Sequence, residues 1–545
     1  MTRNATQRIF ALLCTALVVM TCAFPATPAL ATGSDSAAAA DATSSSSTSS
    51  ASSADVSSTS GTNATIELSR DEQNERFSTT DLGITAGTLA EQQLNSDYPD
   101  ANVHIFQSET DTVTALASGK IEYGFVTEFF ARRFVEQNPG YQYITPAYLD
   151  SSDSIGLAKG NDELREKINQ VLKGFREDGT LEAVKQKWEV DRNYTMDDVP
   201  VNTTGEVLRA ATTGTNEPYT FILDGKDAGE SIELTMRIAY ELGYRVEFLD
   251  MAFSSEITSI VTGKADIGLT LTPTDERRGQ IDFTDEYITS SFVALVKSDD
   301  AGSASFLDVM RDNFTSTFIA ENRWQLILSG LATTCMIACG SFVLGTLGGG
   351  LLTAMRRSPN AHLRRIAQVY ARLATGIPAL VWLMVLYYVA FASTDISALA
   401  TAVICFGLLN SAALAEVFVT GLNGVDKGQM EAATAMGFSR AEAYRRIILP
   451  QAAKNVWPLY SGQLTTLIKE TSIVGYVAIQ DLTKVSDIIR SRTFQAFFPL
   501  LATAAIYFAV IALSAWALGR IGRRFEPRRR DASKILKGIV PRPEA

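Results

Sequence analysis

The sequence predicts a multidomain protein in which an exported α/β region is followed by an all-α membrane region of about five helices. Three observations predict this organisation. The chain begins with a secretory-type segment, residues 66–300 alternate between strand-like and helix-like patterns, and the chain becomes strongly apolar from about Leu326. With 545 residues, of which 46% are hydrophobic, the chain is long enough for several separate cores.

The first 31 residues predict a signal peptide. Basic residues precede an apolar run from Ile9 to Phe24, and Ala29-Leu30-Ala31 provides a small-residue cleavage site. Cleavage is expected after Ala31, with an uncleaved anchor as the alternative. Residues 32–62 are nearly all Ser, Ala and Thr, a composition that buries too little apolar surface to offset the entropy of ordering, so they predict a flexible linker.

Residues 63–300 predict an α/β structure that lies outside the cytoplasm. This part contains no cysteine, so no disulfide framework is expected in it. Short β-branched or aromatic runs predict strands, and longer amphipathic runs between turn signals predict helices. The expected strands are 82–85, 123–127, 208–212, 246–249 and 292–297, and the expected helices are 88–94, 112–118, 162–177 and 231–242.

Residues 326–526 predict the membrane region, which residues 301–325 link to the α/β region. Apolar stretches predict about five spans, some of them tilted or broken, at 326–354, 367–391, 397–422, 454–476 and 496–519. Arginines after the first span, such as Arg356 and Arg357, place that loop in the cytoplasm. Five crossings from outside then place the loop 423–453 and the basic tail 527–545 in the cytoplasm. Lys484, Arg490 and Arg492 in the last outer loop run against this charge rule.

The charge and motif content excludes several function classes. The net charge is −12, and the basic residues of the tail predict a membrane anchor and not a nucleic-acid surface. The only histidines, His104 and His362, are too few for a histidine-based metal site, and no cofactor is expected. No G-x-x-x-x-G-K-[ST] occurs, so the chain is not expected to hydrolyse ATP by itself.

The loop 423–453 contains the most distinctive motif, EAATAMGFSRAEAYRRIILP. It predicts a helix, a turn at Gly437 with positive φ, and a second helix that Pro450 ends. Glu431-Ala432-Ala433, Gly437 and Leu449-Pro450 resemble the EAA loop of ABC importer permeases. The resemblance implies a cytoplasmic surface that docks into an ATPase subunit. The alternative is an ordinary Ala-rich cytoplasmic loop.

Residues 320–526 resemble polar amino acid permeases of the histidine, glutamine and arginine type beyond this loop. Segments 410–416 and 467–472 match those before and after the loop in the family, and they include Glu416 and Lys469. Such ionisable residues mark either a transport path or an interfacial side chain. Val419 replaces a frequent family arginine, and Arg372 lies about a turn earlier than the family's arginine before Pro378.

Residues 201–300 resemble the first lobe of a periplasmic-binding-protein-like (type II) amino acid receptor. The resemblance rests on GTNEPY at 214–219 and on TPTDERR at 272–278 followed by IDFT. It implies that Arg277 binds an α-carboxylate bidentately, helped by Thr270 and Thr272, while Phe253 packs on the ligand. Asn216 lies in the segment that lines the cleft. The alternative for Arg277 is a surface arginine.

Residues 63–200 resemble the second lobe and the closing helices of the same family. Gly87-Thr88 follows a strand and opens a helix, whose N-terminus favours anions. Thr127 stands where the family usually has an aspartate for the α-amino group, and Glu128 is the candidate substitute. The lobes are in reversed order, which indicates either a circular permutation or two half-domains, working or vestigial. Because the family's chain crosses between the lobes after IDFT, residues 293–297 are expected to leave the fold at the hinge.

Together these resemblances imply the membrane subunit of an ATP-driven amino acid importer with a fused substrate-binding domain. The implied partners are a separate ATPase subunit, a second copy of the chain, a polar amino acid and membrane lipids. The alternative class is a ligand-gated channel or sensor, which also joins such domains to membrane spans. A channel needs a pore loop such as TVGYG, and a sensor needs a signalling domain after the last span. Neither occurs in the sequence.

Overall fold

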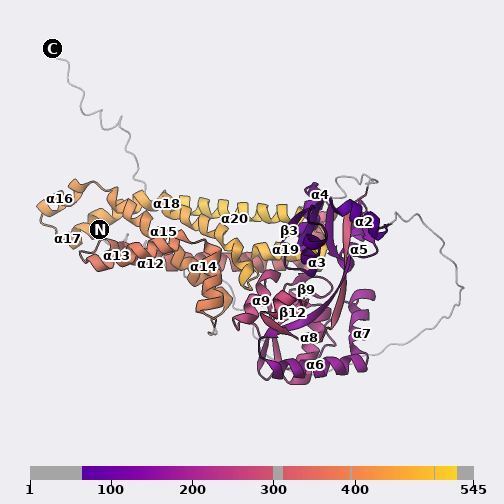
Figure 1. The fold of residues 1–545 in the computed structure, drawn as a ribbon. Helices are drawn as coiled ribbons and strands as arrows, with labels where there is room; N and C mark the ends of the chain where they lie inside the picture. The colour runs from indigo at the N-terminus through magenta and orange to yellow at the C-terminus, as the bar shows by residue number, and fades with distance from the viewer. Residues whose placement is uncertain (1–63, 299–310, 393, 395, 496, 524–545) are drawn as a thin grey trace, which may run out of the picture. The chain divides into compact units, whose positions relative to one another are not determined.

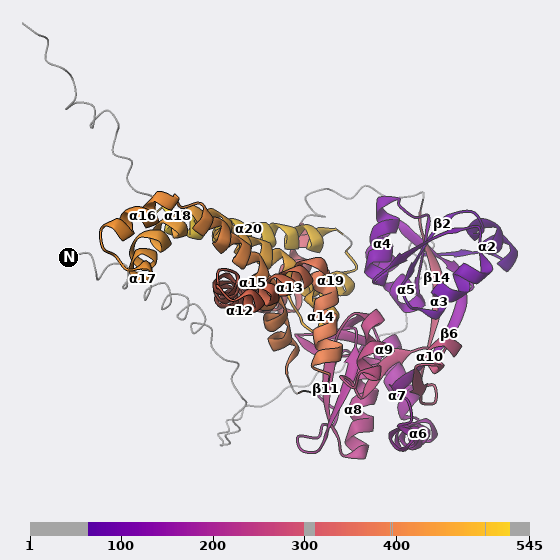
Figure 2. The same ribbon diagram turned by 60° about the vertical axis from the view of Figure 1, so that its left-hand side comes forward.

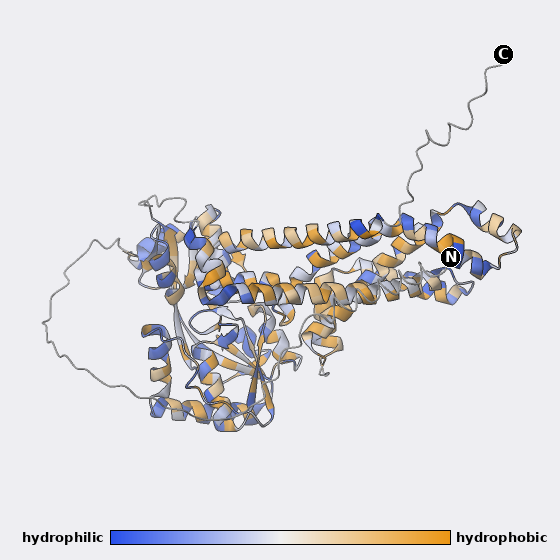
Figure 3. Cartoon of the chain, turned by 180° about the vertical axis from the view of Figure 1, so that it is seen from behind, coloured by the Kyte–Doolittle hydropathy of each residue, from blue (hydrophilic) through white to orange (hydrophobic). Residues whose placement is uncertain are grey.

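The computed structural model describes residues 64–298 and 311–523, apart from 393, 395 and 496. The expected signal peptide, the Ser/Ala-rich linker, the basic tail and part of the expected linker 301–325 lie outside the described residues. An α/β region comes first in the chain and a helical region follows it (Figure 1). Apolar residues predominate along the long helices, whereas the α/β region mixes both kinds (Figure 3).

One lobe of the α/β region has a parallel sheet covered by helices. Strands β2 and β3 pair in parallel, and β2 also pairs in parallel with β4. Phe77, Leu82 and Phe125 are fully buried in its core. The elements of this lobe are β1 (Thr65–Glu67), α2 (Arg70–Phe77), β2 (Asp81–Thr85), α3 (Leu89–Asp97), β3 (Asn102–Phe106), α4 (Glu109–Ser118), β4 (Tyr123–Thr127), α5 (Glu128–Gln137) and β5 (Tyr141–Thr145).

The other lobe combines residues from both sides of position 200. Trp188, after the helix α6, is buried in one core with Phe221 and Ile232 from later in the chain. Its elements are α6 (Asp162–Glu177), α7 (Thr180–Lys185), η1 (Gln186–Val190), β7 (Val207–Thr212), β8 (Thr215–Asn216), β9 (Thr220–Leu223), β10 (Lys226–Ala228), α8 (Glu230–Leu242), β11 (Arg245–Asp250), α9 (Phe253–Val261), β12 (Ile267–Leu271), α10 (Asp275–Arg278) and β13 (Ile281–Phe283).

Two long strands, β6 (Leu149–Ala158) and β14 (Ile288–Lys297), join the lobes into one sheet. They pair with each other through Asp153 and Ile288, after which β6 continues beside β12 and β13. Beyond Phe292, β14 pairs with β4 and β5 of the first lobe. The expectation that residues 293–297 leave the fold is therefore wrong, because their backbone groups complete that sheet. β6 lies between the two groups of elements (Figure 2).

The sequence patterns located these strands and helices well. The expected strand 123–127 and helix 162–177 coincide with β4 and α6, and the other seven expected elements each overlap an observed one. The region has the predicted fold class, a two-lobed α/β domain of the periplasmic-binding-protein type before a helical membrane domain.

The membrane region is built around two close-packed helices, α12 (Arg323–Arg356) and α15 (Ala398–Asn423). A Cβ at Gly345 would lie 2.7 Å from Nδ2 of Asn410, and one at Gly349 would lie 2.9 Å from Cβ of Leu414. Small residues allow this approach of two backbones. The remaining elements are η2 (Thr315–Ile319), η3 (Ala320–Asn322), α13 (Ala361–Gly376), α14 (Ala379–Val385), η4 (Leu386–Ala390), α16 (Lys427–Ala435), α17 (Arg440–Ala443), η5 (Tyr444–Ile448), α18 (Leu449–Glu470), η6 (Thr471–Val477), α19 (Leu482–Thr493) and α20 (Phe498–Gly522).

The structure shows which of the expected spans, about five and some of them tilted or broken, are continuous helices. Within the described residues, three helices are long and apolar enough to cross a membrane, Arg311–Arg356, Ala398–Asn423 and Phe498–Gly522. The expected span 367–391 is instead two helices bent by 105°, at a break just before Pro378, a residue that interrupts helical hydrogen bonding. The expected span 454–476 overlaps α18, which does not meet the same test and includes Lys454 and Lys469.

Candidate functional site

A cavity of about 350 Å³ lies where the two lobes meet the membrane region. Most of its lining residues have hydroxyl, amide or carboxylate groups, while Tyr219, Met251, Phe253 and Tyr476 contribute apolar surface. The parallel strands β2 and β4 supply Thr85 and Thr127 at their carboxyl ends, which meet at one edge of the sheet. The antiparallel strand β6 supplies Asp153 from within its length. The lobes also contribute Thr88, Glu109, Asp111, Asn216, Thr270 and Thr272, and the membrane region contributes Ser472, Gly475, Asp481, Thr483, Lys484 and Asp487.

Five of the residues expected to bind a ligand line this cavity, namely Thr88, Asn216, Phe253, Thr270 and Thr272. Thr88 is the N-cap of α3, where its hydroxyl accepts a hydrogen bond from the Glu91 N–H at 3.2 Å. The side-chain oxygen of Asn216 is buried and has no hydrogen-bond partner among the described residues. Their roles toward a ligand stay predictions.

Arg277 is buried, but it is not among the residues that line the cavity. Its guanidinium donates to the Thr272 carbonyl at 2.8 Å and to the Gly87 carbonyl, and lies 5.6 Å from the ring centroid of Phe253. Since Gly87 and Thr272 belong to different lobes, Arg277 joins the two lobes across the cleft. Burial lowers the pKa of this guanidinium. Its expected role as the carboxylate ligand stays a prediction.

The carboxylates in the cavity are not the one expected from the sequence. Glu128 begins α5 outside the cavity lining, whereas Glu109 and Asp153 are part of it. Glu109 accepts the Thr127 N–H at 2.5 Å, and burial raises its pKa to about 7. Asp153 accepts the Thr272 hydroxyl at 2.6 Å, and burial raises its pKa to about 6. Residues 153–157 of β6 are all buried, and Asp153 is the charged residue among them. A charged residue in such a strand was the sequence feature that could have pointed to this site.

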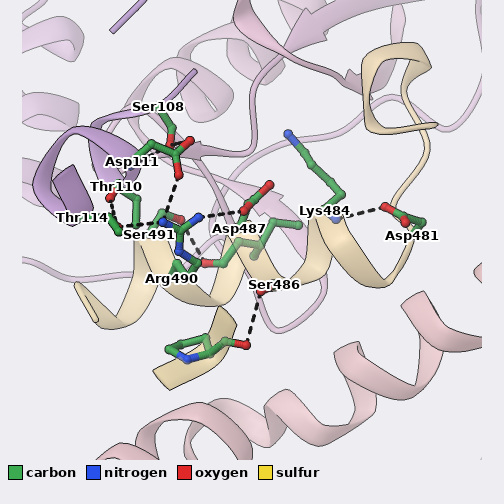
Figure 4. Close-up of polar contacts among 12 residues, drawn as sticks. Ser108, Thr110, Asp111, Thr114, Asp481, Lys484, Ser486, Asp487, Arg490 and Ser491 are labelled. Atoms are coloured by element: carbon green, nitrogen blue, oxygen red, sulfur yellow. Dashed lines mark hydrogen bonds and ion pairs between the residues drawn. The ribbon is translucent and has the colours of Figure 1, made fainter. Parts of the chain in front are cut away.

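Helix α19 of the membrane region contacts both lobes through its basic residues. Lys484 lies 3.2 Å from the Asp250 carboxylate and donates to the Thr213 carbonyl at 2.8 Å. Arg490 pairs with Asp111 of the other lobe at 2.9 Å and donates to the Thr114 hydroxyl at 2.8 Å. The contacts of Arg490 with Asp111 and Asp487 are visible in Figure 4.

Arg492 forms the most buried of these contacts. Its guanidinium pairs with Glu217 and, at 3.0 Å, with Glu321, and lies 4.6 Å from the ring centroid of Phe221. The side chains of Arg492 and Glu217 are only 6% and 2% exposed. Lys484, Arg490 and Arg492 are the residues that oppose the positive-inside pattern. Their charges are matched by acidic residues of the α/β region, which removes the reason to expect them in the cytoplasm.

The expected coupling loop forms α16 and α17, at the opposite end of the long helices from α19 (Figure 1). Gly437 has φ of +86°, as its turn requires. The expectation that Pro450 ends the second helix is wrong, because α17 continues through η5 into α18. Pro450 sits at the start of α18, directly after the π-helical turn η5, where the irregular hydrogen bonding leaves room for a residue without an N–H.

The side chains of the loop are mostly open to solvent. Glu431 and Ala432 are exposed, Ala433 is buried, and Met436 and Leu449 are 68% and 49% exposed. Exposed apolar side chains beside a carboxylate form a surface suited to a protein partner.

The two residues expected to mark a transport path are not brought together in the cavity. Glu416 is exposed and pairs with Arg356 at 2.6 Å, while Lys469 is exposed near the end of α18. Neither lines the cavity. No group of three or more His, Cys, Asp or Glu side chains in the described ranges could hold a metal ion.

Comparisons with known proteins agree on the membrane region. The family model for the inner membrane component of binding-protein-dependent transport systems matches residues 323–527. GlnP of Rickettsia typhi, described as a glutamine transport system permease protein, is 34% identical over 189 residues, covering 34% of this chain and 87% of the relative. The arginine transport system permease protein ArtQ of Bacillus subtilis is 30% identical over 189 residues, covering 34% and 86%. This chain belongs to the binding-protein-dependent permease family.

Two solved structures show some likeness to parts of this permease. An amino acid ABC transporter solved with histidines is 31% identical, with a TM-score of 0.36, covering 41% of this chain and 100% of that chain. The arginine-bound form of truncated ArgBP from T. maritima is 14% identical, with a TM-score of 0.21, covering 42% and 92%. By the family model and the curated relatives, the permease is a multi-pass inner-membrane component of an ABC importer, a transporter subunit and not itself the ATPase.

Proposed function

We propose that this permease is the membrane subunit of an ATP-driven amino acid importer whose receptor is fused to it in the same chain. The observation that carries the proposal is the set of contacts between α19 and both lobes. A domain that delivers a ligand must be held over the permease with its cleft facing the route of the substrate through the membrane. Buried and half-buried ion pairs to each lobe meet that requirement, and the cavity between them is shared by lobe and permease residues.

Amino acids are the proposed substrate class because the relatives are amino acid permeases by name. Hydroxyls, an amide and carboxylates around an aromatic residue in the cavity suit the replacement of a zwitterion's hydration. A closed cleft opens over the membrane region, and the amino acid passes inward by alternating access.

ATP hydrolysis is assigned to a separate cytoplasmic subunit that binds the loop 423–453. Exposed Glu431 and Met436 and the αL turn at Gly437 support a docking surface there. The α/β region lies outside the cytoplasm in this proposal, with the loop and the C-terminus inside. Since the described residues of one chain supply one set of spans, a symmetric homodimer forms the path.

The test is reconstitution of the full chain with the ATPase subunit that copurifies with it. Proteoliposomes containing ATP should accumulate a radiolabelled amino acid without any added binding protein. Uptake that appears only when a separate binding protein is supplied would contradict the fused receptor. Failure of any ATPase subunit to copurify, with uptake independent of ATP, would contradict the importer itself.

A further inference from the structure

We infer that the cavity binds a cationic amino acid, whose α-ammonium group pairs with one of the carboxylates Glu109 and Asp153 and whose side-chain guanidinium or ammonium group pairs with the other. This inference rests on the proposed function, since it names the class of amino acid for the same site. Three observations support it. They are the charged residues that line the cavity, the ion pairs that some of these residues already form, and the buried polar atoms in the lining that have no hydrogen-bond partner.

Acidic residues outnumber basic ones around the cavity. The acidic lining residues are Glu109, Asp111, Asp153, Asp481 and Asp487, whereas Lys484 is the one lysine or arginine in the lining. Lining charge alone does not define a ligand, because protein cations can neutralise carboxylates.

Three of the five carboxylates are already satisfied by the permease. Arg490 pairs with both Asp111 and Asp487, at 2.9 and 3.1 Å. Asp481 caps α19, accepting the Lys484 N–H at 3.0 Å and the Tyr507 hydroxyl at 3.2 Å. The lysine ammonium itself is committed to Asp250 and to backbone carbonyls.

Among the residues that the structure describes, Glu109 and Asp153 have neither a cation within ion-pair distance nor a hydrogen-bond donor from the permease, and the charge of Arg277 acts on Asp153 only from a greater distance. Within residues 64–298 and 311–523, no lysine or arginine nitrogen lies in ion-pair distance of either carboxylate. Their hydrogen-bond donors are uncharged, the Thr127 N–H for Glu109 and the hydroxyls of Thr272 and Ser151 for Asp153. Two carboxylates with free lone pairs therefore face one cavity.

Two buried polar atoms without hydrogen-bond partners indicate, independently of the carboxylates, which donors and acceptors the ligand must have. The side-chain oxygen of Asn216 is a buried acceptor without a partner, so it calls for an N–H donor. The hydroxyl of Thr85, a residue only 9% exposed, is likewise unpartnered and is able to donate to a carboxylate. Both residues line the cavity.

A cationic amino acid matches this set better than a neutral one. A neutral amino acid brings one ammonium group, which leaves one of the two carboxylates unpaired after burial. A second cationic group pairs with the other carboxylate and supplies additional N–H donors for Asn216. Leaving a buried charge unpaired is unfavourable, so the two ligands should differ in affinity by at least a factor of ten.

The experiment is isothermal titration calorimetry of the full chain in nanodiscs with arginine, lysine, glutamine and glutamate. Arginine or lysine should bind at least about tenfold more tightly than glutamine, and glutamate should bind most weakly. Glu109→Gln and Asp153→Asn should each weaken arginine binding by about 10- to 100-fold and glutamine binding much less. Asp150→Asn is the matched control, because Asp150 is exposed on the same strand and accepts the Ser291 hydroxyl at 2.7 Å.

The outcomes separate this inference from the proposed function. Preferential binding of glutamine or glutamate, or arginine binding unchanged in both variants, would overturn the cationic class and leave an amino acid receptor intact. Absence of binding by all four amino acids would overturn the receptor itself. Because a purely structural role would weaken arginine and glutamine equally, the change in their ratio is the decisive readout, and thermal unfolding of each variant monitors folding.

Discussion

The contact of Arg492 with Glu217 provides the sharpest test of the arrangement between α19 and the lobes. We consider Arg492→Gln, which removes the charge while keeping a polar side chain of moderate length. Glu217 would remain 2% exposed and would keep its hydrogen bond from the Tyr194 hydroxyl at 2.7 Å. The contacts of Arg492 with Glu321 and with the Phe221 ring would be lost as well.

The magnitude follows from the burial of both partners. Removing one member of a buried ion pair costs about 3–5 kcal/mol, because the remaining charge stays desolvated. Separation of the α/β region from α19 would return Glu217 to water, so the cost falls on the docked state and not on the fold of either region. A loss of about 3 kcal/mol corresponds to a shift of roughly 150-fold in the equilibrium between docked and separated states.

Hydrogen exchange of the full chain in nanodiscs measures this equilibrium. Amides in α19 and in β8 should exchange up to about 100-fold faster in Arg492→Gln, while those in α12 and α15 should not change. The double variant Arg492→Met, Glu217→Gln should recover much of the protection, because no buried charge is left unpaired.

The matched control is Arg165→Gln, whose arginine forms an exposed pair with Asp162 at 2.6 Å and should contribute under about 1 kcal/mol. Exchange in α19 that is indistinguishable from the unmodified chain would refute the reasoning, as would a double variant that is no better protected than the single one.

Three further predictions concern the coupling loop, the cavity and the helix packing. Gly437→Asp should abolish uptake without changing ligand affinity, and Gly437→Asn should be milder because asparagine adopts positive φ more readily; uptake measured beside calorimetry checks both. Arginine affinity should fall as the pH is lowered below about 7, because the pKa values of Glu109 and Asp153 are raised to about 7 and about 6 and a cation binds the ionised forms; a flat calorimetric profile from pH 5.5 to 8 would contradict this. Gly345→Leu should lower the yield and melting temperature of the folded permease, since its Cβ would meet Asn410, whereas Gly350→Leu meets nothing within 4 Å and should be neutral.

Local patterns predicted the elements of the α/β region because the residue pattern of each strand or helix matches the secondary structure that it forms. The strand 123–127 alternates small and bulky apolar residues, and the helix 162–177 has a clear polar face, so both were located at their observed bounds. The crossing strands β6 and β14 were harder. Their pairing joins residues more than 130 positions apart, which no local period encodes.

The basic residues of α19 illustrate the same limit. Their charge was visible in the sequence as an exception to the positive-inside pattern, yet their partners lie hundreds of residues earlier in the chain. Phe494, just after α19, is 1% exposed and packs on Phe130 at a ring distance of 5.0 Å. An aromatic residue in an outer loop gives no sign of belonging to the core of another region.

Pro450 shows how a correct local rule gives a wrong boundary. Proline disrupts hydrogen bonding to the preceding turn, which favours a helix end. Here the preceding turn is the π-helix η5, whose altered bonding lets the chain remain helical from Arg440 to Glu470. Proline correctly indicated a change in the helical hydrogen bonding near residue 450. Ile448 and Ala452 nevertheless pack together with Val425, which keeps the two helical segments joined.

The spacing of basic residues on α19 has a mechanical consequence. Arg490 contacts one lobe and Arg492 the other, only two residues further along the same helix. A hinge movement about β6 and β14 changes the separation of Asp111 and Glu217, so it must either break one pair or move α19. Because Arg492 is the more buried pair, the half-exposed contact of Arg490 with Asp111 is the one that yields first. If the lobes of the proposed receptor open and close in this way, we expect α19 to move or to lose the Arg490 pair while the Arg492 pair holds the domain in place. The covalent linkage then keeps the released carboxylate close enough to pair again.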